Sequence, residues 1–139
     1  MDLSILIVTY NSAKLIRGLL EHLGTELKQL NAEVIVVDNA SRDQTAELVR
    51  DAFPWVRLIA SPDNLGFAAG NNLAAKHAHG RYLLLLNPDA VPAPGALVRG
   101  IALMNQHPKA GLAGGELRGA DGSRQPSARM FPRLSDEIF

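Results

Sequence analysis

The stretch Arg81-Tyr82-Leu83-Leu84-Leu85-Leu86-Asn87-Pro88-Asp89-Ala90 decides which class of fold this sequence predicts. Its apolar run, 83–86, is too short for a helix and predicts a strand buried on both faces, as in a parallel sheet with helices on either side. Pro88 cannot continue a central strand, so the chain leaves the sheet there and delivers Asp89 at the strand's carboxyl end. Ligands bind at that end in open α/β sheets. A simple turn residue is the alternative interpretation of Asp89.

The rest of the chain alternates between short apolar runs and amphipathic segments. Further strands are predicted at 3–8, 34–37, 56–59 and 110–113, and helices at 12–27, 41–52, 66–79 and 94–106. Ser12 or Asn11 is expected to cap the first helix, a capping box of Ser41 and Gln44 the second, and Gly80 to end the third. This alternation predicts an α/β fold with a mostly parallel sheet and flanking helices.

Composition limits the class of protein. With 139 residues, 47% of them apolar, the chain suits one globular domain with a real core. Basic and acidic residues number 14 each, so the balanced charge argues against a general nucleic-acid binder. There is no cysteine, which excludes disulfides and cysteine-based zinc sites. No apolar run approaches the ~18 residues of a membrane span, so we expect a cytoplasmic location.

Three polar clusters follow predicted strands: Thr9-Tyr10-Asn11, Asp38-Asn39 and Asn87-Pro88-Asp89. In a parallel sheet all three emerge at one edge, where they can form a concave, ligand-sized site. A single carboxylate such as Asp89, together with substrate phosphates, is the usual way a protein holds Mg²⁺ or Mn²⁺. Asp38 can only accept hydrogen bonds when ionised, so it suits an imide N–H or a ribose hydroxyl, and a turn or helix-entry role is the alternative.

Four blocks of the sequence occur in the order seen in family 2 glycosyltransferases. They are Ser4-Ile5-Leu6-Ile7-Val8-Thr9-Tyr10-Asn11, Val36-Val37-Asp38-Asn39-Ala40-Ser41, Asn64-Leu65-Gly66-Phe67-Ala68-Ala69-Gly70-Asn71 and Leu86-Asn87-Pro88-Asp89-Ala90. The chain resembles the rhamnosyltransferase-like branch of that family, extended by the segment 125–132. The resemblance covers nearly the whole chain.

The resemblance implies a Rossmann-like GT-A nucleotide-diphospho-sugar transferase fold. It also implies inverting transfer of a sugar from a UDP- or dTDP-linked donor to an acceptor such as a cell-surface polysaccharide or a lipid-linked glycan, which would place the protein at the inner face of the membrane. Thr9 and Asp38 would contact the base and ribose, and Asp89 would hold Mg²⁺ or Mn²⁺. The full set of nucleotide-sugar contacts that we predict is Thr9, Tyr10, Asn11, Asp38, Asn39, Asn64, Gly66, Asn71 and Asn87.

The sequence departs from the family pattern in three ways. Asn87 replaces the first aspartate of the Asp-x-Asp metal motif, and Gly70 precedes Asn71 where many relatives carry an arginine. The acidic Glu-Asp block that supplies the catalytic base in the family is missing, since the acids after Asp89 are only Glu116, Asp121, Asp136 and Glu137. We therefore interpret 1–115 as a donor-binding domain and 116–139 as the irregular start of an acceptor-side region. The catalytic base stays unassigned.

Two other classes of α/β protein fit the sequence less well. A dinucleotide-dependent oxidoreductase needs Gly-x-Gly-x-x-Gly after the first strand, and the residues 9–14 contain no glycine. A phospho-acceptor receiver domain needs an acidic cluster near that strand, where only Asp2 is acidic. A non-catalytic nucleotide-binding module remains the alternative to an enzyme. The apolar residues Met130, Phe131 and Phe139 could pair two chains into a homodimer.

Overall fold

The computed structural model describes residues 1–119 and 121–125. The chain forms two compact units, Met1–Gln106 and His107–Phe139, which are taken separately below. The predicted division at 115/116 is a division of function and stays a prediction. The residues expected to pair two chains, Met130, Phe131 and Phe139, lie outside the described part.

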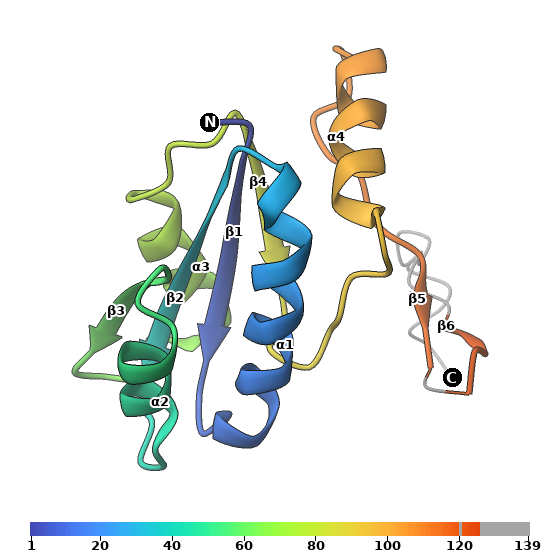
Figure 1. Cartoon of the computed structure of the whole chain (residues 1–139). Coiled ribbons are helices and arrows are strands. Elements are labelled where there is room, and N and C mark those ends of the chain that lie inside the picture. The colour runs from blue at the N-terminus through green and yellow to red at the C-terminus, as the bar shows by residue number, and fades with distance from the viewer. Residues whose placement is uncertain (120, 126–139) are drawn as a thin grey trace, which may run out of the picture. The chain divides into compact units, whose positions relative to one another are not determined.

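Four parallel strands make up the sheet of the first unit (Figure 1). They are β1 (Leu3–Thr9), β2 (Ala32–Asn39), β3 (Arg57–Ser61) and β4 (Tyr82–Leu86), in the order β3-β2-β1-β4. Ile7 of β1 pairs with Val36 on one side and Leu86 on the other, so the three apolar runs lie in register. The predicted parallel α/β sheet is confirmed, although the third strand begins one residue later than expected.

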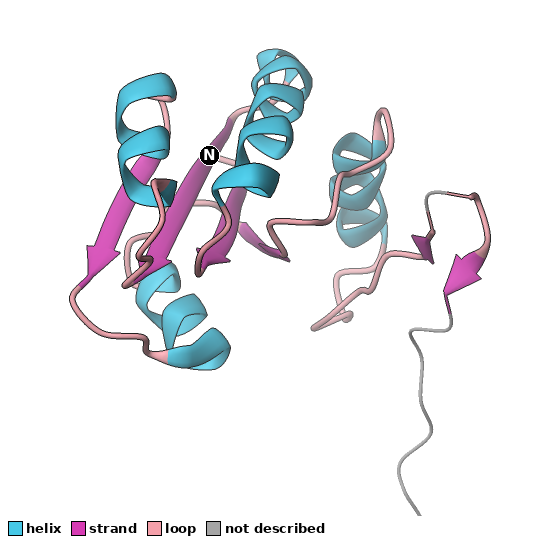
Figure 2. Ribbon diagram, turned by 90° about the horizontal axis from the view of Figure 1, so that it is seen from below, coloured by secondary structure: helices cyan, strands magenta, loops and turns pink. Residues whose placement is uncertain are grey.

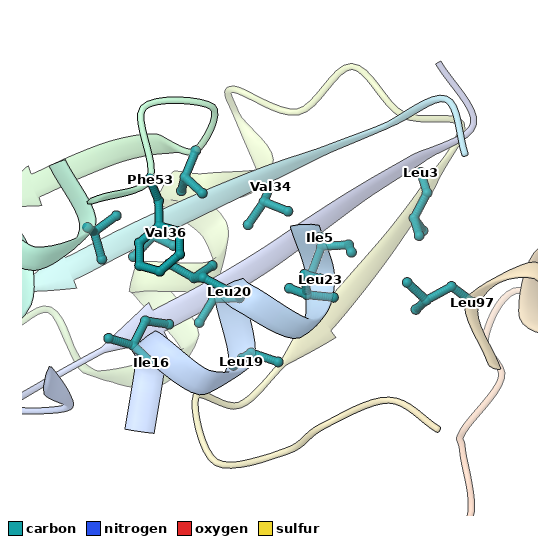
Figure 3. Packing of buried hydrophobic residues seen from close by; sticks show 13 residues of the cluster. Leu3, Ile5, Ile16, Leu19, Leu20, Leu23, Val34, Val36, Phe53 and Leu97 are labelled. Carbon is teal, nitrogen blue, oxygen red and sulfur yellow. The ribbon is translucent and has the colours of Figure 1, made fainter. Parts of the chain in front are cut away.

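Helices cover both faces of this sheet (Figure 2). On one face lie α1 (Ala13–Glu26), which continues into the 3₁₀ turn η1 (Leu27–Gln29), and α2 (Thr45–Ala52), and on the other lies α3 (Gly66–Ala75). The last helix of this unit is α4 (Ala96–Gln106), whose Leu97 joins the larger core cluster. The larger core cluster lies on the α1 side and joins Leu20 and Leu23 of α1 to Ile5 and Val34 of the sheet (Figure 3). A smaller cluster packs Ala74 of α3 against the other face.

The apolar run that predicted the fold is buried on one face only, so that part of the prediction is wrong. Leu84 and Leu86 pack against the larger core cluster, whereas Leu83 is 48% exposed and Leu85 is 53% exposed. The reason is that β4 is an edge strand and α3 packs chiefly on β1 and β2. A run of leucines cannot by itself distinguish a strand covered on both faces from one covered on a single face.

Of the predicted helix caps, Ser12 does occupy the N-cap position of α1, but none of the predicted side-chain caps forms. Ser41 and Gln44 form no capping box, because Ser41 Oγ donates instead to Oδ1 of Asp38. Neither Ser12 nor Asn11 caps α1 through its side chain. The third helix ends at Ala75, before Gly80, and Gly80 is needed for another reason: a Cβ there would lie 2.3 Å from the backbone nitrogen of Ser4. Close backbone approach to β1 explains this glycine.

The second unit contains a short hairpin in place of the predicted strand at 110–113. Residues 110–113 have no regular structure, and β5 (Leu117–Arg118) pairs antiparallel with β6 (Arg124–Gln125). The dipeptide Asp121-Gly122, a typical turn sequence, lies in the turn of this hairpin, where Gly122 has φ +79° and Asp121 Oδ1 accepts hydrogen bonds from Ser123. Across both units, no helix among residues 1–119 and 121–125 has the length and apolar character to span a bilayer.

Candidate functional site

The polar clusters predicted to meet at one edge of the sheet do so. The four strands β1 to β4 are parallel, and their arrowheads point toward one edge of the sheet (Figure 1). Thr9, the last residue of β1, pairs directly with Asp38 of β2. Asn87 follows β4 immediately, in a turn closed by the hydrogen bond from Ala90 N to Asn87 O at 3.1 Å. Strand ends that are far apart in the sequence therefore form one polar rim.

Asp38 is the centre of this rim and is almost fully buried, with 3% of its surface exposed. Its Oδ1 accepts hydrogen bonds from the hydroxyls of Thr9, at 3.0 Å, and Ser41, at 2.5 Å. Its Oδ2 accepts one from the backbone N of Ser41 at 3.0 Å. A carboxylate offers about four acceptor positions, so one on Oδ2 stays available to a ligand. The side chain is thus oriented by the protein and retains capacity for one further donor.

The loops after β1 and β2 are hydrogen-bonded to one another. Asn11 donates its backbone N–H to Ser41 Oγ at 2.9 Å, and its Oδ1 accepts from the backbone N of Arg42 at 2.8 Å. Asn11 and Ala40 both have positive φ, 49° and 58°. Such backbone is uncommon for residues other than glycine and persists only where its surroundings hold it. Here each loop supplies the contacts that hold the other.

Two further contacts join the same parts of the chain and involve Asp43 and Thr45. Asp43 Oδ2 accepts from the backbone N of Ala13, and Thr45 Oγ1 accepts from that of Ser12. Asp43 is exposed; desolvation raises its pKa, but hydrogen bonds from Thr45 and from Ala13 N outweigh that effect, so this pKa lies below its ordinary value. Asp43 is therefore a carboxylate across the neutral pH range.

The start of α3 approaches the end of β2 closely. Asn39 is buried and donates through Nδ2 to the carbonyl of Gly66 at 3.1 Å, while Asn64 Oδ1 accepts from Gly66 N. Gly66 has φ +76°, which favours glycine. A Cβ on Gly70 would lie 2.9 Å from Cγ1 of Val8, so position 70 faces the sheet and has no room for the arginine that relatives were expected to carry there.

Two buried amide oxygens at this end of the sheet lack protein donors. They are Oδ1 of Asn39 and Oδ1 of Asn71, and neither accepts a hydrogen bond within residues 1–119 and 121–125. The Nδ2 of Asn71 donates to the carbonyl of Phe67 at 2.9 Å, which fixes the amide plane. A buried acceptor without a donor is costly, so both oxygens suit hydroxyl or amino groups of a ligand or ordered water.

The remaining predicted contacts are exposed at the same edge. Tyr10 is 49% exposed, and Asn11, Asn87 and Asp89 are also exposed. Among the described residues, no group of three or more His, Asp or Glu side chains could hold a metal ion by itself. Asp89 therefore fits a cation only as a single protein ligand that shares the ion with phosphate oxygens.

An open groove lies away from these residues. It lies between α1 and α2 and is lined by Arg17, Gln44, Glu47, Leu48, Asp51 and Ala52. None of the strand-end residues lines it, and its two carboxylates do not converge with polar groups from the sheet. The rim, where buried polar groups converge, is the better candidate site.

Residues 4–134, nearly the whole chain, match the sequence model of the family described as Glycosyl transferase family 2. The chain belongs to this family. A relative in Mycobacterium tuberculosis, an N-acetylglucosaminyl-diphospho-decaprenol L-rhamnosyltransferase, is 28% identical over 95% of this chain and 46% of its own length. The poly(ribitol-phosphate) beta-N-acetylglucosaminyltransferase TarS of Staphylococcus aureus is 29% identical over 99% of this chain and 24% of its own. The chain thus spans less than half the length of these relatives.

Solved structures of similar glycosyltransferases have the same fold. TarS 1–349 in complex with UDP superposes with a TM-score of 0.70 at 30% identity, covering 77% of this chain and 33% of that one. The mannosyltransferase PcManGT of Pyrobaculum calidifontis, in complex with GDP-Man and Mn²⁺, gives a TM-score of 0.68 at 29% identity, covering 74% and 32%. The GT-A fold implied by the sequence resemblance is confirmed, and the chain corresponds to part of it.

Sequence reasoning missed the residues that hold the rim together. Ser41 was assigned to a helix cap, and Asp43, Thr45 and Ser12 were given no role at the rim. The partners of these side chains lie about 30 residues away in sequence, so no local pattern identifies them. Only the parallel pairing of β1 with β2 brings the two loops side by side.

Proposed function

We propose that this chain is the donor-binding part of an inverting family 2 glycosyltransferase. The complete enzyme would transfer a sugar from a nucleoside diphosphate sugar to a glycan or lipid-linked acceptor. Family membership supports this proposal, and so do relatives crystallised with UDP, UDP-GlcNAc and GDP-Man. The observation that carries it is the buried Asp38, whose carboxylate is oriented by Thr9 and Ser41 at the ligand-binding edge of the sheet.

Asp38 would read the base of the donor. The N3–H of uracil or thymine is a hydrogen-bond donor, and cytosine has no such group. The free position on Asp38 Oδ2 would accept that N–H, while exposed Tyr10 and the unpaired Oδ1 atoms of Asn39 and Asn71 would contact other parts of the nucleotide. This assignment favours a UDP- or dTDP-linked sugar as the donor.

The diphosphate would lie toward the end of β4. Asp89 is exposed directly after this strand, and a relative is crystallised with Mn²⁺, which supports a divalent cation shared between Asp89 and the phosphates. Mg²⁺ or Mn²⁺ bound there would neutralise the charge that develops on the leaving nucleoside diphosphate. Asn87, also exposed, would donate an amide hydrogen bond rather than bind the ion as a second carboxylate would.

Neither of the described acids after Asp89 has the properties of a catalytic base. Glu116 is held by Arg118 at 2.8 Å and Arg124 at 3.0 Å. Hydrogen bonds from Ser123 hold the pKa of Asp121 below its ordinary value, whereas a general base works best with a pKa near the working pH. Asp136 and Glu137 lie outside the described residues. We therefore assign no base within residues 1–125.

A non-catalytic nucleotide-binding module is the second candidate, and the unassigned base favours it for residues 1–139 taken alone. A thermal-shift screen of UDP-, dTDP- and GDP-sugars with and without Mn²⁺ tests donor binding. A coupled assay for released nucleoside diphosphate then separates an enzyme from a binding module. Donor binding without turnover is the expected result, since general-base help is worth about 10²–10⁴-fold in rate. No shift with any nucleotide would overturn the proposed function.

The location and acceptor of the complete enzyme are part of the same proposal. The rhamnosyltransferase relative is named for a diphospho-decaprenol substrate, which supports a lipid-linked acceptor. We accordingly propose a cytoplasmic donor site that works at the inner face of the membrane. Fractionation of cells that express the complete protein, followed by detection in cytosol and membranes, tests this location.

A further inference from the structure

Side chains of the segment at the start of α2 hold the first backbone N–H groups of both α1 and α2. Neither the residue before α1 nor the residue before α2 caps its helix through a side chain. The first backbone N–H groups of α1 are instead bound by the loop before α2. Ala13 N donates to Asp43 Oδ2 at 3.1 Å, and Ser12 N donates to Thr45 Oγ1 at 2.9 Å.

Asp43 and Thr45 form a single unit. Asp43 Oδ1 accepts from both the hydroxyl and the backbone N of Thr45, while Asp43 Oδ2 accepts from Ala13 N. The Thr45 hydroxyl therefore donates to Asp43 and accepts from Ser12, which uses it in both directions. Thr45 is fully buried, so no water replaces it as the acceptor for Ser12.

These contacts lie beside the residues that would bind the nucleotide. Tyr10 and Asn11 directly precede Ser12, and Ser41 lies between Asp38 and Asp43 in the chain. Asn11 N also donates to Ser41 Oγ, and Ser41 donates to Asp38. A shift of the β1–α1 loop would thus be transmitted to Ser41 and through it to the Asp38 carboxylate.

We propose that Asp43 and Thr45 are positioning residues for nucleotide binding, which lock the β1–α1 and β2–α2 loops together so that Tyr10 and Asp38 hold one fixed arrangement. The proposal rests on the proposed function, because it takes Tyr10 and Asp38 as nucleotide contacts. A site that is fixed before the ligand arrives does not lose loop freedom on binding, which improves affinity. The lock acts through the loops and does not require contact with the ligand.

Asp43→Asn separates the two contacts of Asp43, the one with Ala13 and the one with Thr45. The retained amide oxygen still accepts from Thr45, while the NH₂ that replaces Oδ2 cannot accept from Ala13 N. The hydrogen bond from Ala13 N to Asp43 is lost, whereas the contact of Asp43 with Thr45 is kept. Thr45→Val likewise removes the acceptor for Ser12 N, and Thr45→Ser restores a hydroxyl at the same place.

The test measures the affinity for uridine diphosphate by titration calorimetry at a temperature where every variant is fully folded by circular dichroism. Val34→Ala is the control for lost stability, since Val34 is a buried core residue that is not among the rim contacts. We expect Asp43→Asn and Thr45→Val to weaken binding about tenfold, whereas Thr45→Ser and Val34→Ala bind nearly as the unmodified chain does. Amide hydrogen exchange should also become faster in both loops of Asp43→Asn.

Each outcome decides a different claim. The positioning role is overturned if Asp43→Asn binds uridine diphosphate as tightly as the unmodified chain does, or if Val34→Ala loses as much affinity as Asp43→Asn. Either result leaves the proposed function intact. A Thr45→Ser variant as weak as Thr45→Val also contradicts it, because the hydroxyl is then not the active group. Absence of uridine diphosphate binding by the unmodified chain overturns the proposed function and the positioning role with it.

Discussion

The hydroxyl of Thr9, at the end of β1, donates a hydrogen bond of 3.0 Å to Oδ1 of Asp38, at the end of β2. Both side chains are buried, and the two residues are direct partners in the parallel sheet. The register of the sheet therefore sets the orientation of the carboxylate that we propose as the reader of the base. This relationship joins the fold to the function, because a slip of one residue would turn one of the two side chains to the opposite face.

Thr9→Val should weaken binding of uridine diphosphate and lower stability. Valine has nearly the same shape as threonine but no hydroxyl, so Asp38 loses one of its three donors. A hydrogen bond to a charged group is worth about 1.5–3 kcal/mol, and we expect a loss of stability in that range from urea unfolding. Thr9→Ser, which keeps the hydroxyl, serves as the control. Equal stability of Thr9→Val and the unmodified chain would show that Asp38 does not depend on Thr9.

Asp89→Ala should abolish the part of nucleotide affinity that depends on Mn²⁺ and leave the fold intact. Asp89 is exposed after β4 and contributes little to the core, so its loss affects ligand binding rather than packing. Calorimetric titration with uridine diphosphate, with and without Mn²⁺, measures this. Asp63→Ala, at another exposed loop position, is the matched control. If Mn²⁺ enhances binding by the Asp89→Ala variant as it does in the unmodified chain, Asp89 is not the metal ligand.

Gly70→Ala should destabilise the protein by about 1–3 kcal/mol because it overpacks the α3 interface. The added Cβ would lie 2.9 Å from Cγ1 of Val8, a separation that requires the helix or the valine to move. Gly18→Ala in α1 is the control, since its Cβ meets nothing within 4 Å and alanine favours a helix by about 1 kcal/mol. Chemical denaturation compares the two. The double variant Gly70→Ala/Val8→Ala should recover part of the loss, and no recovery would contradict the steric explanation.

Glu33→Gln should remove a pH-dependent part of the stability. Burial raises the pKa of Glu33, but hydrogen bonds from Ser4 Oγ, at 2.6 Å, and His79 N, at 2.7 Å, outweigh it and lower the pKa. A lowered pKa in the folded state means that the stabilisation is full above the unfolded value of about 4.3 and is lost as pH falls through the folded pKa. The difference between the unmodified chain and Glu33→Gln should therefore shrink as the pH falls below the unfolded value and through the lowered folded pKa.

Urea unfolding at several pH values measures this difference. Glu21→Gln is the control, because Glu21 pairs with Arg17 at the surface at 3.8 Å and such pairs contribute about 0–1 kcal/mol. A constant difference between the unmodified chain and Glu33→Gln across that pH range would contradict the lowered pKa of Glu33.

The architecture was predictable because the strands and helices differ in length and period. The runs at 3–8, 34–37 and 83–86 identified β1, β2 and β4, and the order of the elements then placed Thr9, Asp38 and Asn87 at one edge. What could not be predicted was which faces of the strands the helices cover. Whether a helix lies over β4 depends on where α3 packs, so the exposure of Leu83 and Leu85 is a property of the tertiary structure.

Local sequence patterns gave wrong predictions for residues that make contacts with distant parts of the chain. Ser41 has the spacing of a capping box with Gln44, yet Asp38 and Asn11 bind its hydroxyl first. Gly80 has the position of a helix end, yet the backbone of β1 requires it. In both cases the local sequence suggests one role, but the residue contacts a part of the chain that is close only in the folded sheet. The loop lock of Asp43 and Thr45 could not be found from sequence for the same reason.

The central claim is that Asp38 accepts the N3–H of a uracil or thymine base, and the most direct measurement compares uridine, thymidine and cytidine diphosphates by titration calorimetry. The account predicts that the unmodified chain binds UDP or dTDP at least tenfold more tightly than CDP, since an unmade hydrogen bond to a charged group costs about 1.5–3 kcal/mol. Asp38→Asn should lose that preference, because its amide no longer offers the same acceptor. Equal affinities of the unmodified chain for all three diphosphates would contradict the account.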